Sequence, residues 1–323
     1  MQSLREHYIT QGVSPSTADI MLRAQRDSTH RQYQSYLTLW FEHAAKFSID
    51  SLHPPIPKVI DFMESLRQER RLGYNALNTV RSALSSILLL PDGTPFGQTR
   101  LTKIYMKGVF NMKPPTPRYV DTWDPAVVLR FLRKWAPPAA LTLKELTFKV
   151  VMLVLLVTGQ RIQTLALLDV DCLTVTNDTV VFRIFQLLKQ SRPGYRNPEI
   201  TLRAFPQDNR LCVYTYFLAY LQKTRLIRQG TTAVFLTLNK PHSAATKNTI
   251  SRWVKAIMTQ AGINTARYAP HSVRCASTSA AHRGGAPVNE IMQKAGWASN
   301  DVFAKFYDKP LNETSFQNAV LLN

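Results

Sequence analysis

Residues 267–310 read RYAPHSVRCASTSAAHRGGAPVNEIMQKAGWASNDVFAKFYDKP, and this stretch predicts a compact unit of three short helices. Pro270 stands where a first helical turn begins, and the glycines at 284–285 stand where that helix ends. A second helix is expected over about residues 287–294, before Ala-Gly stops it. A third helix is expected to end near Tyr307, because a proline follows shortly after it.

Four chemically distinctive side chains belong to this unit. His271 and Arg274 are three residues apart, so they share one face at the N-terminal end of the first helix. Free N–H groups and a partial positive charge at such an end suit a phosphate. Trp297 and Tyr307 add an indole N–H and a phenol. Taken singly, each has an ordinary explanation as a surface, capping or core residue; the ordered set of four is harder to explain in that way.

The order H-x-x-R, then G-W, then a terminal Tyr resembles the C-terminal half of a tyrosine recombinase active site. The sequence of residues 271–281 and 295–307 is especially similar to the sequences of the recombinases of DIRS- and Ngaro-like retroelements and of cryptons. The resemblance implies a mainly α fold with a small β-sheet (α+β). It also implies an all-helical N-terminal core-binding domain and a catalytic domain, which together form a C-shaped clamp on DNA.

The charge of the chain points to a polyanionic partner. Its 323 residues suffice for two domains, and they contain 40 Lys and Arg against 21 Asp and Glu. The parts before and after residue 119 are both basic. This excess favours nucleic acid ahead of a membrane surface. Charge carried for solubility alone normally comes with mixed signs.

The cysteines and the N-terminal sequence indicate where in the cell the protein is expected. Cys172, Cys212 and Cys275 are far apart and odd in number, which predicts reduced intracellular thiols. The first ten residues contain no apolar signal-peptide core, and the longest apolar run, residues 150–157, is too short to span a bilayer. We therefore expect a protein that is not secreted, nuclear if it comes from a eukaryotic element and cytoplasmic otherwise.

Residues 1–112 predict a small domain of four or five helices. An aromatic stripe that includes Trp40 is interpreted as its core. On a helix that begins after Gly73, Asn78 and Arg81 lie on a polar face, and small polar groups beside an Arg suit close approach to a DNA backbone. A solvated face explains this pattern equally well. A later helix, near residues 100–110, is expected to turn Leu101, Ile104 and Tyr105 inward.

The Pro-rich residues 113–120 predict a stiff linker, and residues 121–323 are assigned to the catalytic domain. Within it, residues 143–158 form a nearly all-apolar helix, which is followed by T-G-Q-R. The recombinase family has its first catalytic Arg in such a T-G-x-R sequence, so the resemblance assigns this role to Arg161. One departure is Thr164, where many relatives carry an acidic residue.

Residues 179–187 and 199–205 predict a β-hairpin, because both segments have strand composition and a turn lies between them. The family carries its catalytic Lys on such a hairpin, so the resemblance assigns it to Lys189. Arg192 and Arg196 in the same turn are candidate phosphate contacts, and an ordinary solvated lysine remains the alternative for Lys189. A further short strand is expected over residues 233–238.

The resemblance supplies six catalytic positions in chain order: Arg161, Lys189, His271, Arg274, Trp297 and Tyr307. It implies attack by the Tyr307 phenolate on a DNA phosphate, giving a 3′-phosphotyrosyl link and a free 5′-hydroxyl without a metal or nucleotide cofactor. Arginine forks and N–H donors suit the charge that develops on the non-bridging oxygens. His271 is the expected proton acceptor, because a free phenol with a pKa of about 10 is mostly protonated. Lys189 is expected to protonate the leaving 5′-oxygen, and Tyr268 is the next candidate nucleophile.

These features predict a site-specific DNA recombinase or integrase of a mobile element, acting on double-stranded DNA. The tail over residues 312–323 has the spacing of an amphipathic helix. In this family such a helix often docks on a neighbouring subunit, which implies a synaptic homo-oligomer, expected to be a tetramer on DNA; the tail can equally pack on its own domain. A type IB-like DNA-relaxing topoisomerase and a domesticated, cleavage-dead DNA-binding protein are the alternatives.

Overall fold

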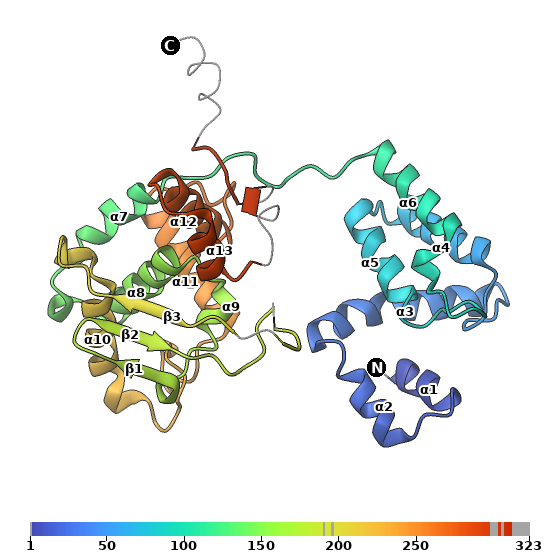
Figure 1. Cartoon of the computed structure of the whole chain (residues 1–323), viewed down its shortest axis with the longest axis horizontal. Coiled ribbons are helices and arrows are strands. Elements are labelled where there is room, and N and C mark those ends of the chain that lie inside the picture. Colours follow the sequence, from blue (N-terminus) through green and yellow to red (C-terminus); the bar gives the residue numbers. More distant parts are fainter. Residues whose placement is uncertain (1, 190, 195–196, 298–302, 305–306, 312–323) are drawn as a thin grey trace, which may run out of the picture. The chain divides into compact units, whose positions relative to one another are not determined.

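The chain divides into two compact units in the computed structural model, Met1–Thr116 and Pro117–Asn323. The division falls within the segment predicted as a linker. The structure describes residues 2–189, 191–194, 197–297, 303–304 and 307–311. Figure 1 shows the elements of both units, and each unit is built around a hydrophobic core of its own.

The first unit is all-helical where it is described. Its elements are α1 (Gln2–Thr10), α2 (Pro15–Leu22), α3 (Asp27–Lys46), α4 (Ile56–Glu69), α5 (Tyr74–Leu84), the 3-10 turn η1 (Phe96–Gln98) and α6 (Arg100–Met112). The aromatic stripe lies on α3, and its interpretation as core is confirmed: Trp40 is fully buried. Its indole N–H donates to the carbonyl of Ser51 at 2.9 Å, so the one polar atom of this side chain is also satisfied.

The buried face of α6 differs from the prediction. Leu101 and Ile104 are 50% and 56% exposed, whereas Thr102, Met106 and Val109 are buried. Apolar residues lie on several sides of this helix, so periodicity alone does not select its inner face. Packing against α4 and α5 makes that choice.

The second unit combines helices with one small sheet. Its main helices are α7 (Pro125–Arg133), α8 (Leu143–Thr158), α9 (Ile162–Leu165), α10 (Val213–Thr224), α11 (Lys247–Gln260), α12 (Ser272–Arg283) and α13 (Val288–Ala295). The antiparallel sheet has the order β1 (Leu173–Val175), β2 (Thr179–Phe182) and β3 (Ile200–Arg203). These elements confirm the predicted mainly α fold with a small sheet.

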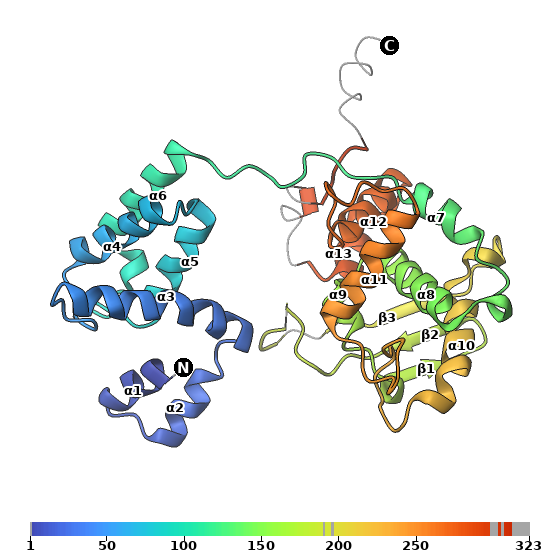
Figure 2. The same cartoon turned by 180° about the vertical axis from the view of Figure 1, so that it is seen from behind.

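Helix α8 is the centre of the second unit. A capping box between Thr142 and Glu145 starts it, and Gly159 ends it in the left-handed conformation, with φ of 59°. It packs against α10, α11, α12 and β3. Figures 1 and 2 show it between the sheet and the pair formed by α12 and α13. Among the described residues, none of the helices is both long and apolar enough to cross a membrane.

The predicted hairpin is present but shorter than expected. β2 pairs with β3 in the register Phe182 with Ile200, and β2 ends there instead of continuing to residue 187. The side-chain amide of Asn197 donates to the carbonyls of Ile184 and Gln186, which takes the place of strand pairing in this segment.

Two other features of the strands differ from the prediction. Strand β1 was not predicted. The strand expected over residues 233–238 was wrong, since that segment makes only isolated bridges, from Ala233 to Asp169 and from Leu236 to Ala244.

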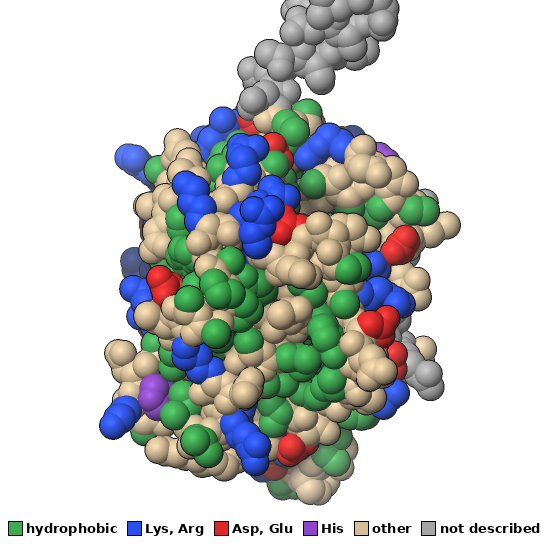
Figure 3. All heavy atoms as spheres, turned by 90° about the vertical axis from the view of Figure 1, so that its left-hand side faces the viewer, with side chains coloured by type: hydrophobic (Ala, Val, Ile, Leu, Met, Phe, Trp, Pro, Cys, Tyr) green, Lys and Arg blue, Asp and Glu red, His purple; other side chains and the backbone are tan. Residues whose placement is uncertain are grey.

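The surface of the second unit, seen from the left-hand side of Figure 1, is mixed. Hydrophobic side chains occupy the middle of this face, and lysine and arginine side chains lie in its upper part, along both edges and near the bottom (Figure 3). Carboxylates are interspersed with them. The basic excess of the chain is therefore not confined to a single patch on this face.

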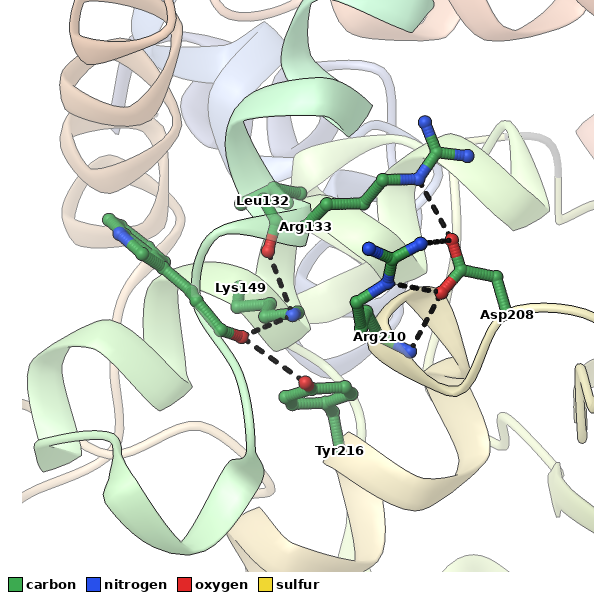
Figure 4. A network of polar contacts seen from close by, with 7 residues as sticks. Leu132, Arg133, Lys149, Asp208, Arg210 and Tyr216 are labelled. Carbon is green, nitrogen blue, oxygen red and sulfur yellow. Dashed lines mark hydrogen bonds and ion pairs between the residues drawn. The ribbon is translucent and has the colours of Figure 1, made fainter.

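A buried lysine joins α8 to the end of α7 (Figure 4). Lys149 is fully buried, and its ammonium donates to the carbonyls of Leu132, at 2.9 Å, and Trp135. The same ammonium lies 3.7 Å from the centre of the Tyr216 ring. Lys149 thus caps the C-terminal carbonyls of α7 from within the core, and these carbonyls and the Tyr216 ring offset part of the cost of burying its charge.

Removing Lys149 is expected to change how stability depends on pH. Burial lowers the pKa of Lys149 to about 7, so between roughly pH 7 and pH 10 the unfolded chain binds more protons than the folded one. In that window this group makes the free energy of unfolding rise with pH. Relative to Lys149→Met, the wild type should therefore gain about 1 kcal/mol per pH unit, measured by urea denaturation at several pH values.

The matched control is Lys144→Met, because Lys144 lies on the same helix and is exposed. Its difference from the wild type should stay constant over the same pH range. A constant difference for Lys149→Met as well would contradict the assigned effect of burial.

Candidate functional site

Arg274 joins the ends of two other helices to α12. Its side chain is only 5% exposed; one terminal nitrogen donates to the Gly159 carbonyl at 2.8 Å and the other to the Ala295 carbonyl at 2.7 Å. These carbonyls lie at the C-terminal ends of α8 and α13. Arg274 Nε is buried and has no hydrogen-bond partner among the described residues.

The turn that carries Arg161 is packed against α12. A Cβ on Gly159 would lie 3.1 Å from the Thr278 methyl, and its positive φ adds strain for any other residue. The Gln160 side chain donates to the carbonyl of Lys294, which ties the same turn to α13. Arg161 follows as the N-cap residue of α9. The sequence T-G-Q-R therefore brings Arg161 to α12, where Arg274 lies.

The electrostatics of the pair favour an anion. Burial is the main cause that lowers the pKa of Arg274, and the neighbouring positive charge of Arg161 lowers it further, while Tyr307 partly opposes both effects. Both effects disfavour the charged guanidinium in the absence of a counter-ion. A bound anion near both arginines would offset both effects.

Trp297 and Tyr307 complete the cluster. Gly296 ends α13 in the left-handed conformation, with φ of 68°, and Trp297 follows it. The Trp297 and Tyr307 ring centres are 4.3 Å apart, and the Arg274 guanidinium lies 4.4 Å from the first ring and 5.4 Å from the second. Trp297 Nε1 is buried without a partner among the described residues. Trp297 Nε1 and Arg274 Nε are thus both unsatisfied donors among the described residues. Their side chains contact each other and lie beside the Tyr307 phenol.

His271 stands at the start of α12. It is the N-cap residue, one position before Ser272, so the helix begins slightly later than Pro270 predicted. Its ring centre is 5.7 Å from that of Tyr119. Burial lowers the pKa of His271, and the charge of Arg118 lowers it further. Near neutral pH the imidazole is therefore kept neutral, the form that can accept a proton.

The linker end contributes to the site in a way that the sequence did not predict. Trp123 Nε1 donates to Ser272 Oγ at 2.9 Å, and the buried carboxylate of Asp121 accepts from Arg267 at 2.7 Å. These bonds fasten residues 118–123 to the loop that carries His271. The partners are almost 150 residues apart in the chain, so no local sequence pattern predicts these hydrogen bonds.

Lys189 and Arg192 belong to the turn that was predicted to carry the catalytic lysine. Both are exposed in the segment between β2 and β3. No contact with the other proposed catalytic residues is found for Lys189 among the described residues. Arg196, the third basic residue predicted in this turn, lies outside the described residues.

Asn78 and Arg81 lie on α5, where both side chains are partly buried. Part of their helix face is covered by η1: the Gly97 N–H donates to Ser85 Oγ at 2.8 Å. A Cβ on Gly97 would lie 2.4 Å from that oxygen and 3.1 Å from Arg81 Cγ, so only glycine fits this approach. The part of α5 that remains open to a DNA backbone is smaller than predicted.

The comparisons with known proteins agree with this arrangement. Residues 138–313 match the phage integrase family. A comparison with curated proteins gives no match. Among solved structures, the Tn1549 transposon integrase in complex with transposon right end DNA is 15% identical, with a TM-score of 0.59, over 99% of this chain and 98% of that one.

Two other structures have the same fold. The XerH site-specific recombinase bound to a palindromic difH substrate is 14% identical, with a TM-score of 0.56, over 82% of this chain and 71% of that one. A lambda integrase tetramer bound to a Holliday junction is 13% identical, with a TM-score of 0.51, over 97% and 78%. Identities this low show a shared fold and no more. Because the family match extends over more than half of the chain, the chain belongs to the phage integrase family of tyrosine recombinases.

Proposed function

We propose that this protein is a site-specific DNA recombinase or integrase that cuts and rejoins DNA strands through a 3′-phosphotyrosyl intermediate. The observation that carries the proposal is a pair of buried donors, Arg274 Nε and Trp297 Nε1, which have no partner among the described residues and lie beside the Tyr307 ring. Buried donors in native proteins are nearly always satisfied. The non-bridging oxygens of a phosphodiester supply the missing acceptors.

In the proposed reaction, the Tyr307 oxygen attacks the phosphorus atom and the bond from phosphorus to the 5′-oxygen breaks. Arg161 and Arg274 stabilise the charge on the non-bridging oxygens. His271 accepts the phenol proton, and Lys189 supplies a proton to the departing 5′-oxygen. One phosphoester bond replaces another, so attack by a 5′-hydroxyl on the phosphotyrosine rejoins the strand without ATP.

Covalent trapping tests this proposal. The protein is incubated with nicked duplex DNA from the termini of its source element, and the products are separated on a denaturing gel. A protein–DNA adduct is expected. DNA binding without an adduct would favour the cleavage-dead alternative. Relaxation of supercoiled plasmid by a monomer would favour the topoisomerase.

Lys189→Ala is expected to cleave ordinary DNA slowly and to recover most of its rate on DNA with sulfur at the bridging 5′-position. A thiol is far more acidic than an alcohol, so a 5′-thiolate leaves without the proton that the lysine supplies. Single-turnover cleavage of the two substrates measures the effect.

Arg274→Ala is the comparison, and sulfur should restore little of its rate because its loss concerns the non-bridging oxygens. If sulfur rescues neither variant, Lys189 only positions DNA, and Arg192 or Arg196 takes its place as the candidate acid. Full activity of Lys189→Ala on ordinary DNA would exclude a catalytic role for this side chain.

The proposed partners are double-stranded DNA and further copies of this chain. We propose that the two units grip DNA as a clamp, with Asn78, Arg81, Arg192 and Arg196 as contacts, and that residues 312–323, which lie outside the described residues, dock on a neighbouring subunit in a synaptic tetramer. The sequence similarity of the active-site stretch supports an origin in a DIRS-like, Ngaro-like or crypton element. Such an origin implies that the protein acts in the nucleus of a eukaryotic cell.

A further inference from the structure

Helix α12 has a second functional face, turned away from Arg274. Cys275, Ser279, His282 and Arg283 follow one another at helical spacing, so they share this face. All four contact the backbone or side chains of residues 307–309. The helix that carries Arg274 therefore also holds the segment that carries Tyr307.

Ser279 makes the central contact of this face. Its side chain is fully buried. Its hydroxyl donates to the carbonyl of Tyr307 and accepts from the N–H of Lys309 at 3.0 Å. One oxygen atom thus bridges both sides of Asp308, and it closes the turn that follows the proposed nucleophile.

Weaker or more exposed contacts surround this bridge. Cys275 Sγ lies 3.5 Å from the Tyr307 carbonyl oxygen. His282 Nδ1 lies 3.0 Å from a carboxylate oxygen of Asp308, and Arg283 donates to the Lys309 carbonyl at 3.0 Å. Both of these side chains are partly or largely exposed. Ser279 is therefore the contact with the least competition from water.

We infer that Ser279 is a positioning residue for Tyr307 in strand cleavage, an inference that rests on the proposed function. The phenol must approach phosphorus at about 3–3.5 Å and in line with the leaving oxygen, and a misplacement of about 1 Å can cost roughly 10²-fold in rate. Ser279 fixes the Tyr307 backbone on the same rigid helix that fixes Arg274. The nucleophile and a phosphate-binding group thereby keep a constant separation before DNA arrives.

The segment has other tethers, so loss of Ser279 should not unfold it. The Thr122 N–H donates to the Pro310 carbonyl at 2.9 Å, and the Tyr307 N–H donates to the Phe303 carbonyl at 2.8 Å. A tilted ring contact with Trp297, at an interplanar angle of 37°, holds the phenol ring itself. Ser279→Ala removes one oxygen atom and leaves these contacts in place, so it tests alignment more than folding.

The test compares Ser279→Ala with the matched variant Ser277→Ala. Ser277 lies on the same helix, is also buried, and donates to the Leu156 carbonyl instead of the Tyr307 segment. Single-turnover adduct formation is measured against DNA concentration. Ser279→Ala is expected to lower the maximal rate by about tenfold to a hundredfold with an unchanged half-saturating concentration, whereas Ser277→Ala stays close to the wild type.

Hydrogen–deuterium exchange of the free protein supplies a readout that does not depend on activity. Exchange in the peptide that contains residues 307–310 should be faster in Ser279→Ala, because the Lys309 N–H loses its acceptor, and unchanged in Ser277→Ala. Faster exchange with a normal cleavage rate would overturn the inference, and so would unchanged exchange. If the wild type forms no adduct, the proposed function fails and the role in cleavage fails with it, while the exchange result still reports the tether.

Discussion

Tyr307→Phe is expected to abolish the covalent protein–DNA adduct and to leave DNA affinity nearly unchanged. The substitution removes only the phenolic oxygen. The ring, whose centre lies 4.3 Å from that of Trp297, remains, as does the backbone held by α12. Adduct formation on nicked DNA is read from a denaturing gel, and affinity is read from fluorescence anisotropy on the same duplex.

Tyr268→Phe is the matched control. Tyr268 was the second candidate nucleophile from the sequence, but its hydroxyl donates to Asp121 at 2.7 Å and burial raises its pKa to about 12. A phenol that is buried, hydrogen-bonded and hard to deprotonate is a poor nucleophile. This variant should therefore still form the adduct. An adduct that persists in Tyr307→Phe and disappears in Tyr268→Phe would reverse the two assignments.

Arg161→Ala and Arg274→Ala are each expected to slow cleavage by at least about 10²-fold, the scale for losing one preorganised donor at a developing charge. The two arginines are near enough for the charge of Arg161 to lower the pKa of Arg274, and in the proposed reaction both act on one phosphate. Rates are measured under single-turnover conditions at saturating DNA, so that weaker binding does not contribute to the effect.

The two substitutions differ in their structural consequences. Arg274 also holds the Gly159 and Ala295 carbonyls, so its loss is expected to lower the melting temperature as well. Arg161 has a less buried side chain and tests the chemistry more directly. Arg225→Ala, at an exposed position after α10, controls for the loss of one positive charge. Near-normal cleavage by Arg161→Ala would refute its assignment.

Local chemistry in the sequence determined the elements that frame the site. The range predicted for α8 agrees with the structure because a capping box starts this helix and a glycine ends it. The glycines after α12 and α13 likewise mark their ends. Such signals lie within a few residues of the feature that they specify. The family resemblance supplied the six proposed catalytic residues, and the helix-end signals placed Arg161, His271 and Trp297 next to the ends of helices. The structure places Arg274, Trp297 and Tyr307 in contact.

Only the tertiary structure decided which surfaces meet. It turned Leu101 and Ile104 outward, ended β2 at Phe182, and fastened Asp121 to Arg267. It also gave the Ser279 hydroxyl its two backbone partners, the Tyr307 carbonyl and the Lys309 N–H. The physical reason is that burial and side-chain hydrogen bonds depend on groups brought together from distant parts of the chain. The residues that cap a helix lie in its own sequence, whereas the residues that cover its buried face come from other parts of the chain.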